Sequence, residues 1–395
     1  MKYWRGYLTA AICAAIAMAL SRFAADHSVL VDMVYPYVSR TLQTMLAEWS
    51  SGVTFCLWQA LAVALVAVAL ALVVLMIIFK WNPIQLVGWV LAGCSVVYLL
   101  HTIVFGLNYH AGPLADDIRL EVTEYTITEL ADATAYYRDR ANELAGQVNR
   151  DASGNVDFAE FEELAEQAGN GFQALTFDGT GAVFSGSTLP VKKLGWSEMY
   201  TSMGITGMTV GITGEAAVNP LIPDVSLPFT MCHEMAHRMS IATESDANFA
   251  AFLACQANES LEFQYSAYFM AYRYCYNALV GVNTETAAAA AARVSSELSE
   301  LVKRDSSAYS AFFAQKRNKT ATKVADTAND AYLRASGDEL GVASYGAVCD
   351  LLVSWHIQEV VRVQEELLEQ EQEQKFDPYD ESQVDLSGIV NAVTP

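Results

Sequence analysis

The sequence predicts a mainly α-helical fold with a small β-sheet (α+β), in which N-terminal transmembrane helices precede a larger water-exposed domain. Long apolar runs without Asp, Glu, Lys or Arg are confined to the first 110 of the 395 residues. Apolar residues recur at helical spacing through most of the remainder. Short Gly-, Thr- and Val-rich stretches typical of strands occur only between residues 172 and 218.

Three apolar runs predict a membrane anchor over residues 1–110, with transmembrane helices at about 7–24, 53–79 and 85–107. The second and third runs are uncharged and have about the 20 residues that a helix needs to span a bilayer. The first run is shorter and alanine-rich. It is either a retained helix or the apolar part of a cleaved signal peptide.

The flanking charges predict the topology. Lys2 and Arg5 precede the first run and Lys80 follows the second, so both places are cytoplasmic under the positive-inside rule. Three crossings then place everything after about residue 108 outside the cytoplasm, and cleavage of the first run would not change this. We therefore expect a multi-pass plasma-membrane protein whose partner is the lipid bilayer and whose C-terminal domain is extracytoplasmic.

Charge separates the two parts of the chain. Residues 1–110 contain 5 Lys or Arg and 3 Asp or Glu, whereas the remainder contains 18 and 42. So acidic a domain repels nucleic acid and anionic headgroups, which argues against nucleic acid as a partner.

Periodicity assigns the elements of the extracytoplasmic domain, which we expect over 111–375. Helices are predicted over 120–148 and 158–168, followed by the small sheet within 172–218. Residues 261–371 are predicted to be helical throughout. Residues 376–395 are polar and are expected to form a loose tail.

The pentad HEMAH, which begins at His233, is the motif that carries chemistry. On a helix, His233 and His237 stand four residues apart on one face, so two imidazoles can share a Zn²⁺ ion. Glu234 can then act as general base toward a water molecule. The flanking residues are apolar, so the helix is expected to be buried, where two histidines and a glutamate are costly without a partner.

A zinc hydrolase needs a third protein ligand, and Glu244 is the candidate. No histidine follows closely, and TESDAN (243–248) resembles the ExxAD signature of gluzincin peptidases, with Asn248 in place of its aspartate. That signature implies that Glu244 binds the metal and that Asn248 supports a ligand histidine. Asp246 is the reserve candidate. The seven-residue spacing from His237 requires a tight turn between two helices, the second capped by Thr243.

Longer blocks resemble a bacterial membrane protein family known only as domain-of-unknown-function family 3810. They are GITGEAAVNPLIPDVSLPFTMCHEMAHRMSIATESDANF (211–249), FGLNYHAGPLADDI (105–118) and GVASYGAVCDLL (341–352). The resemblance covers most of the chain and implies N-terminal transmembrane helices followed by a gluzincin-like zinc-peptidase domain. It implies that His233, His237 and Glu244 bind metal and that Glu234 is catalytic. Relatives typically have glycine where this chain has Ser240.

Two further residues are candidates for contact with a substrate. Tyr345 lies in one of the resembling blocks and is the candidate for stabilising a transition state. Residues 214–219 are expected to form an edge strand or loop that faces the cleft. There Glu215 either pairs with a substrate amine or is simply a surface carboxylate.

A second metal site is a weaker alternative. Residues 149–160 (NRDASGNVDFAE) resemble an EF-hand loop, with Ca²⁺ ligands at Asp151, Ser153, Asp157 and Glu160, but Asn149 replaces the usual first aspartate. The other interpretation is an acidic linker with a glycine turn. The four cysteines beyond residue 110 are either small buried hydrophobic residues or disulfide partners.

The sequence therefore predicts a membrane-anchored zinc metallopeptidase that hydrolyses peptide bonds in an extracytoplasmic peptide or cell-envelope protein. The alternative is a non-catalytic membrane protein that binds a partner and has a structural or sensing zinc site.

Overall fold

The computed structural model is mainly helical and contains one small sheet, as the sequence predicts. It describes residues 4–175, 181–338, 344–361, 363–364 and 367–368. The tail predicted at 376–395 lies outside the described residues.

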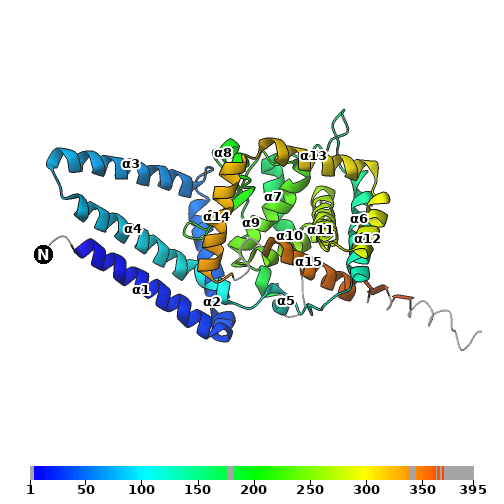
Figure 1. Ribbon diagram of the computed structural model, residues 1–395, viewed down its shortest axis with the longest axis horizontal. Coiled ribbons are helices and arrows are strands. Elements are labelled where there is room, and N and C mark those ends of the chain that lie inside the picture. The colour runs from blue at the N-terminus through cyan, green and yellow to red at the C-terminus, as the bar shows by residue number, and fades with distance from the viewer. Residues whose placement is uncertain (1–3, 176–180, 339–343, 362, 365–366, 369–395) are drawn as a thin grey trace, which may run out of the picture.

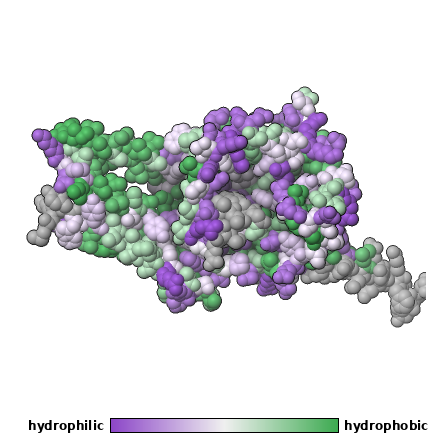
Figure 2. All heavy atoms as spheres, in the orientation of Figure 1, coloured by the Kyte–Doolittle hydropathy of each residue, from purple (hydrophilic) through white to green (hydrophobic). Residues whose placement is uncertain are grey.

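Three N-terminal helices are long and apolar enough to cross a membrane: α1 (Arg5–Asp26), α3 (Leu57–Phe79) and α4 (Pro83–Val104). The 23 residues of α3 rise about 35 Å, which exceeds the roughly 30 Å hydrocarbon core of a bilayer. Its most apolar window has no residue buried inside the protein. In Figure 1 these helices project from one end of the molecule, and Figure 2 shows their largely apolar surface.

Helices α1 and α4 pack closely because glycine removes side-chain bulk at their crossing. A Cβ atom on Gly6 would lie 2.5 Å from the carbonyl carbon of Gly88. The Tyr7 hydroxyl donates to the carbonyl of Ile84 across the same contact, at 2.8 Å. Small residues at such crossings are the usual means by which apolar helices associate.

A fourth N-terminal helix, α2 (Ser28–Ser50), follows α1 and precedes α3 along the chain, and it was not predicted from the sequence. It packs against the short 3₁₀ helix η1 (Gly106–His110) and reaches the larger domain. Polar side chains of α2 are fully or almost fully buried at this contact: Ser39, Arg40 and Gln43. The N-terminal part of the chain is therefore joined to the domain by a polar, hydrogen-bonded contact.

The sheet has three short strands in the order β1-β3-β2. Strand β1 (Lys192–Lys193) is parallel to β3 (Glu215–Val218), and β2 (Gly207–Val210) is antiparallel to β3, with Thr209 opposite Ala216. All four residues of β3 are buried, as expected of a central strand. Strand β2 is an edge strand.

The core of the domain is built around α9 (Leu227–Arg238) and α10 (Glu244–Ala257). Strands β2 and β3 contact α9, and neighbouring helices bury both central helices, with α10 almost wholly buried. Those neighbours are α7 (Phe161–Ala174), α11 (Leu261–Gly281) and α15 (Ser344–Trp355), and α6 (Ile127–Ala145) packs mainly against α11.

The remaining elements lie around this core (Figure 1). They are α5 (Leu114–Asp117), η2 (Gly181–Phe184), α8 (Ser197–Met203), η3 (Asp224–Ser226), α12 (Glu285–Ser296), α13 (Glu300–Lys316), α14 (Lys319–Ser336) and the π-helical segment η5 (His356–Val361). The predicted helices at 120–148 and 158–168 correspond to α6 and α7, and the described part of 261–371 is largely helical.

Candidate metal centre

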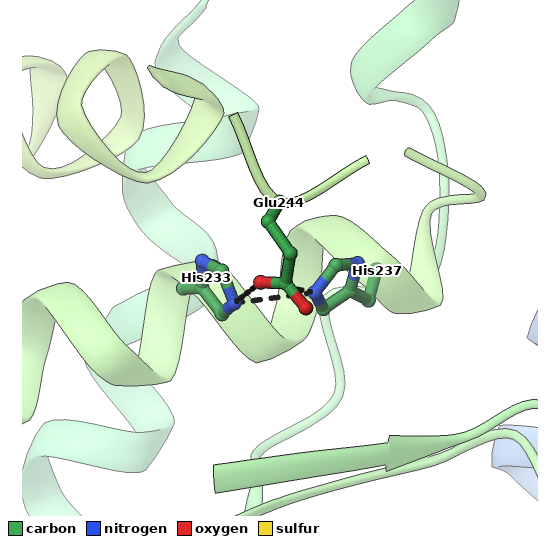
Figure 3. Close-up of side chains that lie close together, drawn as sticks. All are labelled: His233, His237 and Glu244. Carbon is green, nitrogen blue, oxygen red and sulfur yellow. Dashed lines mark hydrogen bonds and ion pairs between the residues drawn. The ribbon is translucent and has the colours of Figure 1, made fainter. Parts of the chain in front are cut away.

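Helices α9 and α10 bring His233, His237 and Glu244 together. The Nε2 atoms of the two histidines lie 3.1 Å apart because the residues are one helical turn apart. Oε2 of Glu244 lies 3.2 Å from Nε2 of His233 and 3.7 Å from Nε2 of His237. Figure 3 shows the three side chains converging from two consecutive helices.

The short connection between the helices is a tight turn that brings the carboxylate back over α9. Helix α9 ends at Arg238, Ser240 adopts a left-handed conformation with φ of 71°, and α10 begins at Glu244. Thr243 is the N-cap, and its hydroxyl accepts from the backbone N–H of Asp246 at 3.3 Å. The seven-residue spacing from His237 to Glu244 is therefore compatible with convergence.

The donor set fits a tetrahedral divalent metal. Ligand atoms about 2.0–2.1 Å from a tetrahedral zinc lie about 3.3 Å from one another, and the three observed separations are 3.1, 3.2 and 3.7 Å. Oε2 of Glu244 is buried and has no hydrogen-bond partner outside the cluster, and Nδ1 of His233, on the other side of its ring, is buried without a partner. A buried carboxylate oxygen that faces two imidazole nitrogens is costly unless a cation or a proton lies between them.

Glu244 and the two histidines stabilise one another's charged forms. Burial opposes the charge on His237, but the hydrogen bond and charge of Glu244 outweigh it and raise the pKa of His237 to about 9. Burial likewise opposes ionisation of Glu244, yet the two histidines hold the pKa of its carboxyl far below its usual range. The carboxylate is thus ionised and available as a metal ligand.

Glu234 lies on the side of α9 that faces the sheet. The hydroxyl of Thr209 in β2 lies 2.8 Å from both the backbone carbonyl and Oε2 of Glu234. Glu234 is 4% exposed, and burial raises the pKa of its carboxyl. A buried carboxylate beside a three-ligand site, with its orientation held by a hydroxyl, has the character of a general base.

A backbone carbonyl supports His237. Nδ1 of His237 lies 2.8 Å from the carbonyl of Ile241, within the turn between the helices. Such a contact fixes the imidazole so that Nε2 faces the ligand cluster. Sequence patterns carry no signal for this contact because every residue has a carbonyl.

Asn248 and Asp246 do not reach the cluster through any described hydrogen bond. Oδ1 of Asn248 accepts from the hydroxyl of Tyr274 at 3.3 Å, and its Nδ2 has no partner. Oδ2 of Asp246 accepts from the backbone N–H of Leu114 at 3.3 Å, at the start of α5. The structure thus gives Asp246 a role in joining α10 to α5.

Tyr345 lies in α15, but its side chain is outside the part of the chain that the structure describes. Other tyrosines lie near the cluster. The charge of Glu244 contributes to raised pKa values of Tyr109, Tyr274 and Tyr332, for which burial is the main cause. Tyr109 belongs to the block FGLNYHAGPLADDI, which is the sequence signal that could have drawn attention to it.

Glu215 is neither a cleft residue nor a surface carboxylate. Its Oε1 accepts from the backbone N–H of Leu57 at 2.7 Å, and its Oε2 accepts from that of Trp58 at 2.8 Å. Nζ of Lys192 lies 2.6 Å from Oε1. The expected edge strand at 214–219 is instead the central strand β3, and the carboxylate stabilises the N-terminus of α3.

Hydrogen bonds within the EF-hand-like loop occupy the carboxylate of Asp151. The Asp151 carboxylate accepts from the backbone N–H groups of Ser153 and Asn155, at 2.8 and 2.9 Å, and Arg304 donates to the carbonyl of Ser153. Asp151, Asp157 and Glu160 are not gathered around a common point, since the described residues contain a single group of potential metal ligands. In this arrangement the loop resembles the acidic glycine-turn linker, and Ca²⁺ binding by it stays a prediction.

The four cysteines beyond residue 110 are free and buried in the core, consistent with small hydrophobic residues. They are Cys232, Cys255, Cys275 and Cys349.

A family model described as "Protein of unknown function (DUF3810)" matches residues 31–353, from α2 to α15. No curated protein and no solved structure matches the chain. The match includes most of α2 and the whole candidate metal centre, and it leaves out α1.

Proposed function

The chain belongs to the DUF3810 family, and we propose that it is a membrane-anchored zinc metallopeptidase that cleaves an extracytoplasmic peptide or cell-envelope protein. His233, His237 and Glu244 would hold the zinc, and Glu234 would serve as general base. The observation that carries the proposal is the buried Glu234 carboxylate, held by Thr209 beside three converging ligand atoms. A metal site with a purely structural role needs no such carboxylate.

Each residue has a definite part in peptide hydrolysis. Bound zinc would supply Lewis-acid chemistry to a peptide carbonyl and to water. Glu234 would accept the proton of the attacking water and deliver it to the leaving amine, which a raised pKa favours. Edge strand β2, which has a β-strand partner on one side only among the described residues, would pair with an extended substrate backbone alongside Glu234.

Tyr109 and Tyr332 join Tyr345 as candidates for stabilising negative charge in the transition state. The hydroxyl of Tyr332 lies 3.2 Å from Nε2 of His101, and the Tyr109 and Tyr332 rings meet edge to face with centroids 6.2 Å apart. Both tyrosines come from elements that lie between the apolar helices and the candidate metal centre. Neutral phenols are suitable hydrogen-bond donors for an oxyanion.

The proposed orientation of the chain in the membrane rests on the positive charges that flank the apolar helices. Lys2, Arg5 and Lys80 would lie in the cytoplasm, which would place the acidic domain outside the plasma membrane after three crossings. The alternative function keeps zinc as a structural or sensing element in a membrane protein that binds a partner. Both functions require bound metal, but only the peptidase requires Glu234.

The deciding experiment measures zinc content and hydrolysis of a quenched-fluorescent peptide library by the full chain. Glu234→Gln should abolish turnover while leaving one zinc per chain, whereas Glu300→Gln, on an exposed helix surface, should change neither. Wild-type protein that binds no zinc would overturn the proposal. Stoichiometric zinc without hydrolysis of any peptide would favour the non-catalytic alternative.

A further inference from the structure

Helix α2 contacts the turn that connects the candidate ligands. Nε of Arg40 donates to the carbonyl of Met239 at 3.1 Å, and its Nη1 donates to the carbonyl of Ala182 in η2 at 2.7 Å. Arg40 is 7% exposed and is a charged donor; its bond to Met239 is buried and its bond to Ala182 is partly buried. Bonds of this kind are stronger than those between neutral groups.

A second side chain of α2 contacts the next residue of the turn. Oγ of Ser39 lies 3.0 Å from Oγ of Ser240 and accepts from the side-chain amide of Asn108 at 2.8 Å. Ser39 in turn donates to the carbonyl of Val104 at the end of α4. Helices α2 and α4 thus hold Ser240 through a buried hydrogen-bond network.

Ser240 needs such support because its backbone is strained. It adopts φ of 71°, a left-handed conformation that is disfavoured for residues other than glycine. Ser240 belongs to the turn that connects His237 to Glu244. The backbone carbonyl of Ile241, in the same turn, orients the His237 ring. A change in the turn would therefore move both the third ligand and the support of the second.

We propose that Arg40 is a positioning residue for the metal centre: it holds the Met239–Ser240 turn so that Glu244 meets the two histidines. The inference rests on the proposed zinc site and assigns α2 to that site rather than to the anchor alone.

A matched control comes from Arg138 in α6, a helix that Figure 1 shows on the side of the domain away from α2. Arg138 in α6 is 5% exposed, and its Nη1 donates to the carbonyl of Val294 in α12 at 3.1 Å. Both arginines therefore join helices by buried bonds to carbonyls. They differ in two respects: Arg138 also forms ion pairs with Asp139 and Glu297, and only Arg40 contacts the turn beside the metal ligands.

The test measures the zinc affinity of the full chain in detergent by competition with a chromophoric chelator, together with the visible spectrum after Co²⁺ substitution. Arg40→Gln should weaken zinc binding about tenfold or more, as removal of supporting groups commonly does, and should alter the Co²⁺ spectrum. Arg138→Gln should lower thermal stability without either effect. Arg40→Lys keeps the charge but has a single donor nitrogen, so its zinc affinity should be intermediate.

A rescue variant distinguishes loss of the position of the turn from a general loss of protein stability. Glycine adopts positive φ without strain, so Ser240→Gly in the Arg40→Gln background should recover part of the zinc affinity. If Arg40→Gln does not fold, Arg40→Lys with and without Ser240→Gly gives the same comparison. Equal zinc affinities in wild type, Arg40→Gln and Arg40→Lys would overturn this inference alone. A wild-type chain that binds no zinc would overturn the proposed function as well.

Discussion

A methyl group placed on Gly207 would lie 2.4 Å from Oε1 of Glu234. The backbone of edge strand β2 therefore passes directly over the proposed general base, at a separation that only glycine allows. Two residues further along the strand, the Thr209 hydroxyl contacts the other carboxylate oxygen. Strand β2 thus determines where the Glu234 carboxylate lies.

Gly207→Ala should reduce peptide hydrolysis by on the order of 100-fold while zinc content stays unchanged. The new methyl group would displace the Glu234 carboxylate, and small misplacements of catalytic groups have effects of this size. Gly146→Ala is the control, because a Cβ there meets no atom within 4 Å. Normal turnover by Gly207→Ala would show that Glu234 works from another position.

Glu244 and Asp246 can be distinguished as ligands by metal content. Glu244→Ala should lose zinc, since its carboxylate lies 3.2 Å from Nε2 of His233. Asp246→Asn should keep zinc, because its Oδ2 contacts the backbone of Leu114 and an amide oxygen can still accept there. Elemental analysis after dialysis against a weak chelator measures both. The reverse outcome would make Asp246 the third ligand.

Glu215→Ala should destabilise the protein by about 3–5 kcal/mol, since it removes the carboxylate that pairs with the half-buried Lys192 and leaves that ammonium only the carbonyls of Ser50 and Phe55. It also removes the carboxylate that accepts from the first two N–H groups of α3. Thermal unfolding in detergent measures the effect. Glu162→Ala is the control, because Glu162 and Lys193 form an exposed pair and its loss should hardly move the melting temperature.

Local sequence features predicted much of the architecture. The apolar runs correspond to α1, α3 and α4 to within a few residues, because an uncharged apolar run of sufficient length determines a helix by itself. The pairing of His233 with His237 is equally local, since it requires only one turn of helix. The convergence of Glu244 also matched expectation, whereas its role as a metal ligand stays a prediction.

Contacts between distant segments could not be predicted in the same way. Glu215 accepts from a backbone group 158 residues earlier in the chain, and nothing near either residue indicates that pairing. Helix α2 lacks an apolar run, and its buried face is polar because it pairs with backbone carbonyls of the domain. Tertiary contacts, rather than local preference, determine these features.

The bond between Arg40 and the carbonyl of Met239 joins residues 199 positions apart. During synthesis the N-terminal segment emerges first, so α2 exists long before the turn that it contacts. The ligand cluster would accordingly reach its final form as a late step of assembly, when the newly made domain docks onto helices that precede it. Delayed maturation of this kind would keep the proposed catalytic centre inactive until its anchor is in place.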